Sequence, residues 1–339
     1  MLVLIAIDAM GGDFGPRVAV PAALRALNKD PCLSVLLVGD LSTIRPLLPE
    51  NSPLLNRIQF RHSDISVAMG DSAKHALRHQ KGSSIHLAVQ AVADQEADAC
   101  VSAGNTGALA VISRYLLKMY PGVSRPAICS QLPVNGGECL MLDLGANLGC
   151  DADDLYQFAL MGSAMAEVMQ SKVSPSVGLL NVGEEELKGT ELVREAADIM
   201  ATSTAIRYEG FIEGSDIFSG QVDVIVCDGI SGNTALKTSE GVVRFLFQQI
   251  RQGFRNTLYG RVVSILVRPV LKSIKRSLNP ERYNGAVLLG LQGVVVKSHG
   301  AAEVEGFYRS ILHATHAVRS GLCERVGDKV ANRGADTSL

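Results

Sequence analysis

The stretch Leu2-Val-Leu-Ile-Ala-Ile-Asp-Ala-Met-Gly-Gly-Asp-Phe-Gly-Pro16 places an apolar run, a glycine-rich turn and a proline in succession. The apolar run predicts a buried strand over 2–7. Pro16, in the favoured first position of a helix, predicts a helix over 16–28. A strand that leads through a tight loop into a helix is the building unit of an α/β fold.

The same alternation continues along the chain. Short apolar runs that end in Gly, Asp or Asn alternate with segments of helical period, which predicts a mostly parallel sheet covered by helices. The further predicted strands are 34–38, 98–102, 127–131, 139–143, 177–181, 223–227 and 293–297, and the further predicted helices are 84–95, 153–170, 190–201 and 233–255.

Composition limits the function classes. The chain has 339 residues, of which 47% are hydrophobic, and its formal net charge of -2 disfavours a nucleic-acid partner, which would favour a strongly basic domain. Seven scattered cysteines without a CxxC pair support neither a disulfide framework nor a zinc site. No apolar stretch approaches the roughly 18 residues of a membrane-spanning helix, so we expect a soluble, cytoplasmic protein.

Six loops follow predicted strands and are rich in Gly, Asn, Asp and Thr. They are Asp8–Asp13, Ser102–Gly107, Asp143–Asn147, Asn181–Gly189, Asp228–Thr234 and Lys297–Gly300. Ligands of open parallel sheets bind at the carboxyl ends of the strands, and glycine amides beside helix N-termini suit phosphate. The nucleotide motifs GxxxxGK[ST] and GxGxxG are absent, as are GxSxG and HExxH.

Some histidines and one cysteine have competing interpretations. His75 and His79 have the spacing of two metal ligands on one helix face, but a solvated basic loop near the site is favoured. His313 and His316 are expected to be structural parts of a terminal helix. Cys227 ends a strand and could be a nucleophile, yet a buried small hydrophobe is the favoured interpretation.

Read in order, the loops resemble those of the bacterial phosphate acyltransferases, the acyl-ACP:phosphate acyltransferases of phospholipid synthesis. The matching stretches are IAIDAMGGDFGP (5–16), QKGSSI (80–85), VSAGNTGAL (101–109), LDLGAN (142–147), NVGEEELKG (181–189), GFIEGSDI (210–217), VDVIVCDGISGNTALKTSEG (222–241) and KSHGAAE (297–303). They span nearly the whole chain. One departure is Gly285-Ala-Val-Leu-Leu-Gly290, which has a single leading Gly and a Val where the family pattern has a Gly pair and a Pro.

The resemblance implies an α/β fold similar to the isocitrate and isopropylmalate dehydrogenases, with α/β/α layers and two lobes around a cleft, in a homodimer. It implies one enzyme unit of two lobes over 1–330. The last nine residues, 331–339, are polar, so we expect a disordered tail there. The implied reaction transfers a fatty acyl group from acyl carrier protein to inorganic phosphate, and a membrane glycerol-3-phosphate acyltransferase consumes the acyl phosphate. No cofactor and no metal are expected.

For this reaction we expect Lys188 to be the principal cation, because it follows a strand end, although pairing with Glu184 or Glu185 is the alternative. The Lys188→Ala substitution is then expected to lower the rate by about a hundredfold. Lys237 and His299 are further candidates for charge, and Asn233 completes the predicted catalytic set. The predicted phosphate and substrate contacts are Gly11, Gly12, Asp13, Asn105, Thr106, Asn147, Ser231, Gly232 and Gly300.

Between Gly241 and Pro280 there is no acidic residue but there are eight basic ones. Apolar residues recur at every fourth position, and Pro269 is expected to break or kink the helix, which predicts a basic amphipathic helical hairpin in a membrane interface. Docking of the acidic carrier protein and packing in a dimer are the alternatives. The predicted membrane contacts are Phe254, Arg255, Leu258, Arg261, Val262 and Leu266.

Other functions remain open from the residues alone. A phosphotransacetylase that uses acyl-CoA and a non-enzymatic membrane scaffold of lipid synthesis are the alternatives. A decarboxylating dehydrogenase of the same fold would need metal-binding aspartates and a nucleotide loop that the sequence lacks.

Overall fold

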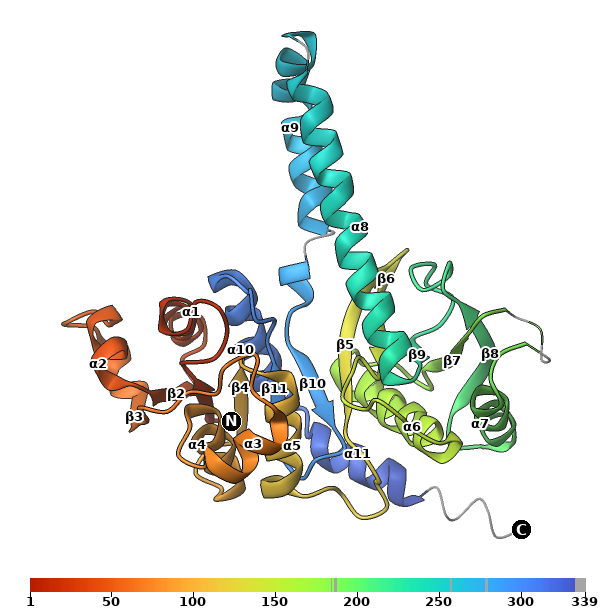
Figure 1. Ribbon diagram of the computed structural model, residues 1–339, viewed down its shortest axis with the longest axis horizontal. Helices are drawn as coiled ribbons and strands as arrows, with labels where there is room; N and C mark the ends of the chain where they lie inside the picture. The colour runs from red at the N-terminus through yellow and green to blue at the C-terminus, as the bar shows by residue number, and fades with distance from the viewer. Residues whose placement is uncertain (184, 186–187, 257, 278–279, 333–339) are drawn as a thin grey trace.

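The computed structural model describes residues 1–332 except 184, 186–187, 257 and 278–279. In this part of the chain, one eleven-stranded sheet has the order β3-β2-β1-β4-β11-β10-β5-β6-β9-β7-β8 (Figure 1). The strands are β1 (Val3–Asp8), β2 (Leu33–Gly39), β3 (Ile58–His62), β4 (Ala99–Ser102), β5 (Ala127–Val134), β6 (Gly137–Leu142), β7 (Ser176–Asn181), β8 (Arg207–Glu213), β9 (Val224–Val226), β10 (Ala286–Leu289) and β11 (Val294–Lys297).

Helices cover both faces of the sheet. They are α1 (Pro16–Lys29), α2 (Leu41–Ile44), α3 (Ala73–His79), α4 (Ser84–Ala93), α5 (Thr106–Leu117), α6 (Ala152–Met169), α7 (Glu191–Thr202), α8 (Gly229–Arg255), α9 (Leu258–Ser277), α10 (Val304–Arg319) and α11 (Leu322–Ala331). Alternate residues of each strand face opposite sides, so Ile5 and Ile7 join the core under α1, α6 and α10, whereas Ala6 joins the core under α4 and α5. The predicted α/β architecture with a large central sheet is confirmed.

The sheet is mostly parallel, as predicted, but it contains antiparallel pairs in the middle. β10 is antiparallel to both β11 and β5, and β5 is antiparallel to β6. β6, β9, β7 and β8 therefore run opposite to β1, β4 and β11. The reason is the tight turn at Asn135 and Gly136, since Gly136 has φ +84° and joins β5 to β6 as a hairpin. Consequently, the loops after β1, β4 and β11 leave the sheet at one end of the strands, and the loops after β6, β7 and β9 leave it at the opposite end.

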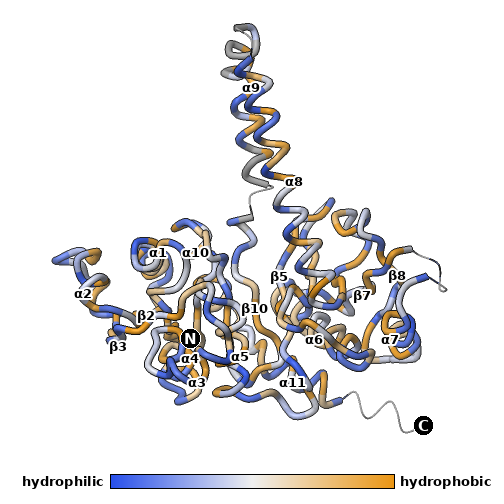
Figure 2. Tube along the Cα trace, in the orientation of Figure 1, coloured by the Kyte–Doolittle hydropathy of each residue, from blue (hydrophilic) through white to orange (hydrophobic). Residues whose placement is uncertain are grey.

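The predicted hairpin is present. α8 and α9 stand out together from the body of the molecule, and apolar and polar stretches alternate along both (Figures 1 and 2). Pro269 was expected to break or kink the helix, and α9 continues through it, so the helix is not broken there. None of the described helices is both long and apolar enough to span a bilayer.

The chain end falls partly outside the described residues. Ala331, predicted to begin a tail, is the last residue of α11, and 333–339 are not described.

Candidate functional site

Three neighbouring strands end at the same level in the first half of the sheet. Asp8 of β1 pairs in register with Ser102 of β4, which pairs in turn with Lys297 of β11. The Ser102 hydroxyl donates to the Asp8 carboxylate at 2.6 Å and accepts the N–H of Gly104 at 3.0 Å. Burial raises the pKa of Asp8. These strand ends form the floor of the candidate site.

Glycines let the loops above this floor approach each other closely. Gly12 has φ +85°, and a Cβ atom there would lie 2.8 Å from the carbonyl oxygen of Gly300 and 2.9 Å from the Ala103 side chain. The N–H of Asp13 donates to the Gly300 carbonyl at 2.9 Å. The structure therefore brings Gly11, Gly12, Asp13 and Gly300 together, and their role in phosphate binding stays a prediction.

Asn105 holds the start of α5 and a neighbouring loop. Its side-chain oxygen caps α5 by accepting the N–H of Ala108 at 2.9 Å, and its Nδ2 donates to the carbonyls of Met69 at 3.0 Å and Asp71 at 2.9 Å. Because its amide hydrogens are used internally, Asn105 shapes the site. The N–H groups of Thr106 and Gly107, in the first turn of α5, have no intrahelical acceptor and remain suited to an anion.

Lys237 of α8 and His299, which follows β11, meet above the same floor. Nζ of Lys237 lies 3.1 Å from Nε2 of His299 and 3.0 Å from the carboxylate of Glu240. Burial, followed by the charge of Lys237, lowers the pKa of His299, so the imidazole is neutral near pH 7.

The protonation of His299 is limited by both of its nitrogens. Nε2 faces the Lys237 ammonium, which can only donate, at 3.1 Å, and Nδ1 faces the N–H of Ala301 at 3.2 Å, whereas a neutral imidazole accepts at one nitrogen only. Lys237 directs two of its three hydrogens at Glu240 and His299. Its remaining hydrogen is suited to an anionic oxygen.

The second group of loops is built around a buried aspartate. Asp143 accepts the N–H groups of Ile128, Ala146 and Asn147 at 2.8–3.0 Å. Asn147 donates its side-chain amide to Asp143 at 3.0 Å and to the carbonyl of Pro126 at 2.7 Å. Asn147, predicted as a phosphate donor, thus uses its donors to hold the loop.

The first turn of α8 packs directly on this loop. Asp228 caps the helix by accepting the N–H groups of Ile230 and Ser231 at 2.9 Å, and the Ser231 hydroxyl donates to it at 2.5 Å. Gly232 has no room for a side chain, because a Cβ atom would overlap the Asp143 carbonyl. Ser231 and Gly232 therefore fix the helix, while Asn233 is exposed beside Gly145.

α8 connects the two groups of loops. Asn233 and Lys237 lie four residues apart on one helix face, about 6 Å along the axis. Asn233 adjoins the Asp143 loop, whereas Lys237 contacts His299 beside the end of β11. α8 begins at the second group of loops and reaches the first through the contact of Lys237 with His299.

The profile of a family described as fatty acid synthesis protein matches residues 3–325. A phosphate acyltransferase of Shewanella loihica is 50% identical over 318 residues, covering 93% of each chain, and one of Hydrogenovibrio crunogenus is 46% identical over 97% of this chain and 98% of its own. The chain belongs to this family of phosphate acyltransferases. It is an acyltransferase enzyme, as the resemblance implied.

Solved structures agree on the fold. A phosphotransacetylase from Streptococcus pyogenes superposes with a TM-score of 0.61 at 16% identity over 94% of both chains. A branched-chain phosphotransacylase from Enterococcus faecalis gives 0.57 at 14% identity over 94% of this chain and 99% of that one. At these identities the likeness establishes the fold alone.

Lys188, the predicted principal cation of this phosphate acyltransferase, lies in the loop between β7 and α7. Its side chain is 52% exposed, and Nζ pairs with Glu185 at 2.7 Å. The charges that act on Lys188 are those of Glu185 and Glu213, at the outer edge of the sheet, and they raise its pKa. None of its described contacts is with Lys237, His299 or α5. The role of Lys188 stays a prediction.

The other candidates of the phosphate acyltransferase sequence have structural explanations. His75 and His79 stack with ring centroids 5.1 Å apart on α3, and in the described residues no group of three potential ligands could hold a metal ion. Burial raises the pKa of the Cys227 thiol far above its usual range, as expected of a buried small hydrophobe.

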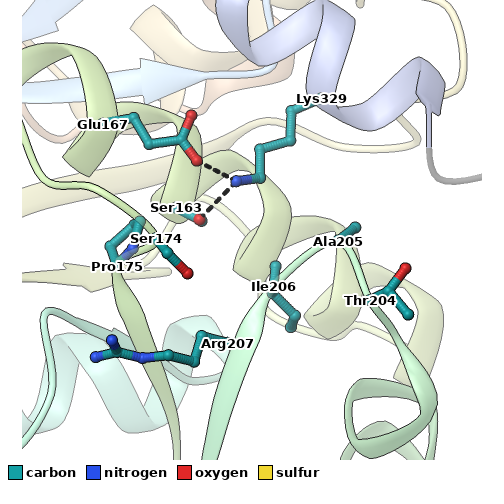
Figure 3. Close-up of a pocket in the computed structure, with 9 residues that line it drawn as sticks. All are labelled: Ser163, Glu167, Ser174, Pro175, Thr204, Ala205, Ile206, Arg207 and Lys329. Carbon is teal, nitrogen blue, oxygen red and sulfur yellow. Dashed lines mark hydrogen bonds and ion pairs between the residues drawn. The ribbon is translucent and has the colours of Figure 1, made fainter.

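A pocket of about 450 Å³ opens elsewhere in this acyltransferase, between α6, β8 and α11 (Figure 3). Lys329 points into it and donates to Ser163 at 2.9 Å and to Glu167. None of the predicted site residues lines this pocket. The ammonium group of Lys329 is already paired with Glu167.

Lys297 is the residue that sequence reasoning missed in this phosphate acyltransferase. It ends a run of three valines over 294–296, all buried, and its side chain is itself only 8% exposed. The available signal was a lysine at the end of a buried strand beside Ser298, His299 and Gly300, a loop already recognised as a candidate.

Proposed function

We propose that the enzyme binds inorganic phosphate in the crevice between the start of α5 and α8, and transfers to it a fatty acyl group from acyl carrier protein. The observation that carries the proposal is the contact between Lys237 and His299 at 3.1 Å, which brings a cation of α8 to the loop that follows β11. Acyl transfer to phosphate is the activity for which the relatives are named.

The chemistry needs little from the protein beyond position and charge. A phosphate oxygen attacks the thioester carbonyl, the C–S bond breaks, and the proton of the phosphate dianion ends on the departing thiol. The phosphate dianion forms near neutrality without a strong base. Donors directed at the developing oxyanion supply about 3 kcal/mol each, and close placement of the reactants supplies the entropic part.

Asn233 and Lys237 have complementary places in this scheme. Lys237 and His299 contact the phosphate or the oxyanion, and Asn233, one helical turn earlier, is placed to donate to the thioester carbonyl. The tight packing of Gly12 against Gly300 keeps the floor of the crevice fixed. We further propose that the crevice is the cleft between two lobes, as in the isocitrate dehydrogenase-like fold, in a homodimer.

The hairpin of α8 and α9 is proposed to lie on the inner face of the cell membrane. Its exposed apolar side chains include Phe245, Leu246, Leu266 and Val270, with exposed Arg244, Arg251, Arg268 and Lys272 among them. Among the predicted contacts, Phe254 is half-buried and Leu266 is exposed, whereas the side chains of Leu258, Arg261 and Val262 lie outside the described residues. Each basic residue near an anionic surface adds about 1 kcal/mol. A membrane location would deliver acyl phosphate to a membrane glycerol-3-phosphate acyltransferase.

One assay tests the proposed reaction. The protein is incubated with long-chain acyl carrier protein or with the matching acyl-CoA, each with and without phosphate, and acyl phosphate is measured. We expect phosphate-dependent acyl phosphate from the carrier-bound substrate. Product from acyl-CoA alone would assign the phosphotransacetylase alternative, and no acyl phosphate from either donor would leave the scaffold alternative.

A further inference from the structure

Lys297 occupies an unusual place for a lysine. It is the last residue of β11, between β4 and β10 in the middle of the sheet, and its side chain is 8% exposed. Its register partner is Ser102, which bonds to the buried Asp8. A lysine is rarely buried to this extent unless its charge is paired.

The ammonium group of Lys297 has no direct counter-charge. Nζ donates to the carbonyl of Ala103 at 3.2 Å and to that of Ser298, which uses two of its three hydrogens. Of the described carboxylates, none lies within ion-pair distance of Nζ. The pKa of Lys297 is lowered to about 8, mainly by burial and also by the charge of Lys237, while the charges of Asp8 and Asp13 act in the opposite direction.

The surroundings of Nζ favour an anion. Ala103 directly precedes the turn that starts α5, so the ammonium lies beside a helix N-terminus with open N–H groups. Lys237 and His299 lie close enough to be coupled to Lys297, since the charge of Lys237 lowers the pKa of Lys297 and the charge of Lys297 lowers the pKa of His299. A buried cation with a spare hydrogen and a helix N-terminus together form a site for a phosphoryl oxygen.

We propose that Lys297 is a catalytic residue that donates its third hydrogen to a phosphate oxygen and anchors inorganic phosphate at the floor of the crevice. The inference rests on the proposed function, since it concerns the phosphate of that reaction. It assigns the buried cation of the phosphate site to β11 and not to the loop of Lys188.

The test compares four proteins: wild type, Lys297→Met, Lys297→Arg and Lys329→Met. Lys329 is the matched control, because it is also a largely buried lysine, 13% exposed, but it lies in the pocket behind α6. For each protein, thermal unfolding is followed with and without phosphate, which requires no activity. Steady-state rates are then measured with phosphate varied at saturating acyl donor.

We expect phosphate to stabilise wild type and Lys329→Met against heat and to leave Lys297→Met unchanged. The KM for phosphate should rise by about a hundredfold in Lys297→Met, with a smaller change in the KM for the acyl donor. Lys297→Arg, which keeps the charge, should recover part of the affinity even where the Met variant folds poorly.

Two results separate this inference from the proposed function. A Lys297→Met protein that keeps the wild-type phosphate KM, or equal phosphate stabilisation of wild type and Lys297→Met, overturns the role of Lys297 alone. A wild-type protein that forms no acyl phosphate from either donor overturns the proposed function itself.

Discussion

Nζ of Lys237 lies 3.1 Å from Nε2 of His299, although the two residues are 62 positions apart in the chain. The first belongs to α8 and the second to the loop after β11, so their meeting joins the two halves of the sheet. We consider this pair the centre of the site.

Lys237→Met is expected to lower kcat/KM by about a hundredfold, because it removes one donor to an anionic reactant. His299→Ala should have an effect of similar size. Since the two side chains act on one oxygen, the double variant should lose much less than the product of the two single losses. Strictly multiplicative losses in the steady-state assay would show that the pair does not act as a unit.

Gly12→Ala is expected to destabilise the fold and to weaken phosphate binding. A Cβ atom at Gly12 would lie 2.8 Å from the Gly300 carbonyl oxygen, and the backbone has φ +85°. The control is Gly136→Ala, where φ is +84° but no atom lies within 4 Å of the added Cβ. Both variants carry the backbone strain of about 1–2 kcal/mol, and Gly12→Ala should lose about 1–3 kcal/mol more. Chemical unfolding that gives equal losses would refute the close packing.

The affinity for phosphate should fall as the pH rises above about 8. Lys297 loses its proton there, since burial lowers its pKa to about 8 against the opposing charges of Asp8 and Asp13. Phosphate is already a dianion above this pH, so a further change comes from the protein. Lys297→Arg should remove the fall, because guanidinium stays charged. Phosphate KM values between pH 7 and 9.5 check this, and a fall that persists in Lys297→Arg would assign it to another group.

The Phe245→Asp, Leu266→Asp double variant should lose binding to anionic vesicles. Both side chains are more than half exposed on the hairpin. Aspartate at these positions removes apolar contact with the lipid and weakens the electrostatic attraction of the hairpin to anionic lipid. Val173→Asp is the control, since Val173 is 93% exposed away from the hairpin. Sedimentation should separate the double variant from wild type and control. Equal binding by all three would leave carrier docking or dimer packing to explain the hairpin.

Local sequence signals predicted most of the elements but not their directions. The strand over 3–8 and the helix from Pro16 were predicted within a residue, because apolar runs and a proline act locally. The short strand β10 and the outer strands β3 and β8 were missed. β3 and β8 contain polar residues, which obscure the alternation of apolar and polar positions by which a strand is recognised. The hairpin that reverses the second half had a signal in Asn135-Gly136, a dipeptide typical of tight turns, which was not used.

The candidate site was predicted by loop and not by side chain. The structure brings together Gly11, Gly12, Asp13 and Gly300. Their loops could be recognised beforehand, because glycine-rich turns are visible in the sequence. The amides of Asn105 and Asn147, in contrast, are used within the protein, and only tertiary structure reveals their acceptors. Lys297 was missed for a related reason, since burial of a lysine at a strand end depends on helices distant in the chain.

The most direct test of the account is the crystal structure of the enzyme with inorganic phosphate. We predict phosphate in the crevice, within hydrogen-bond distance of the Thr106 or Gly107 amide, of Nζ of Lys297 and of Lys237 or His299. Phosphate bound instead at the Lys188 loop, with the crevice at α5 empty, would contradict the account.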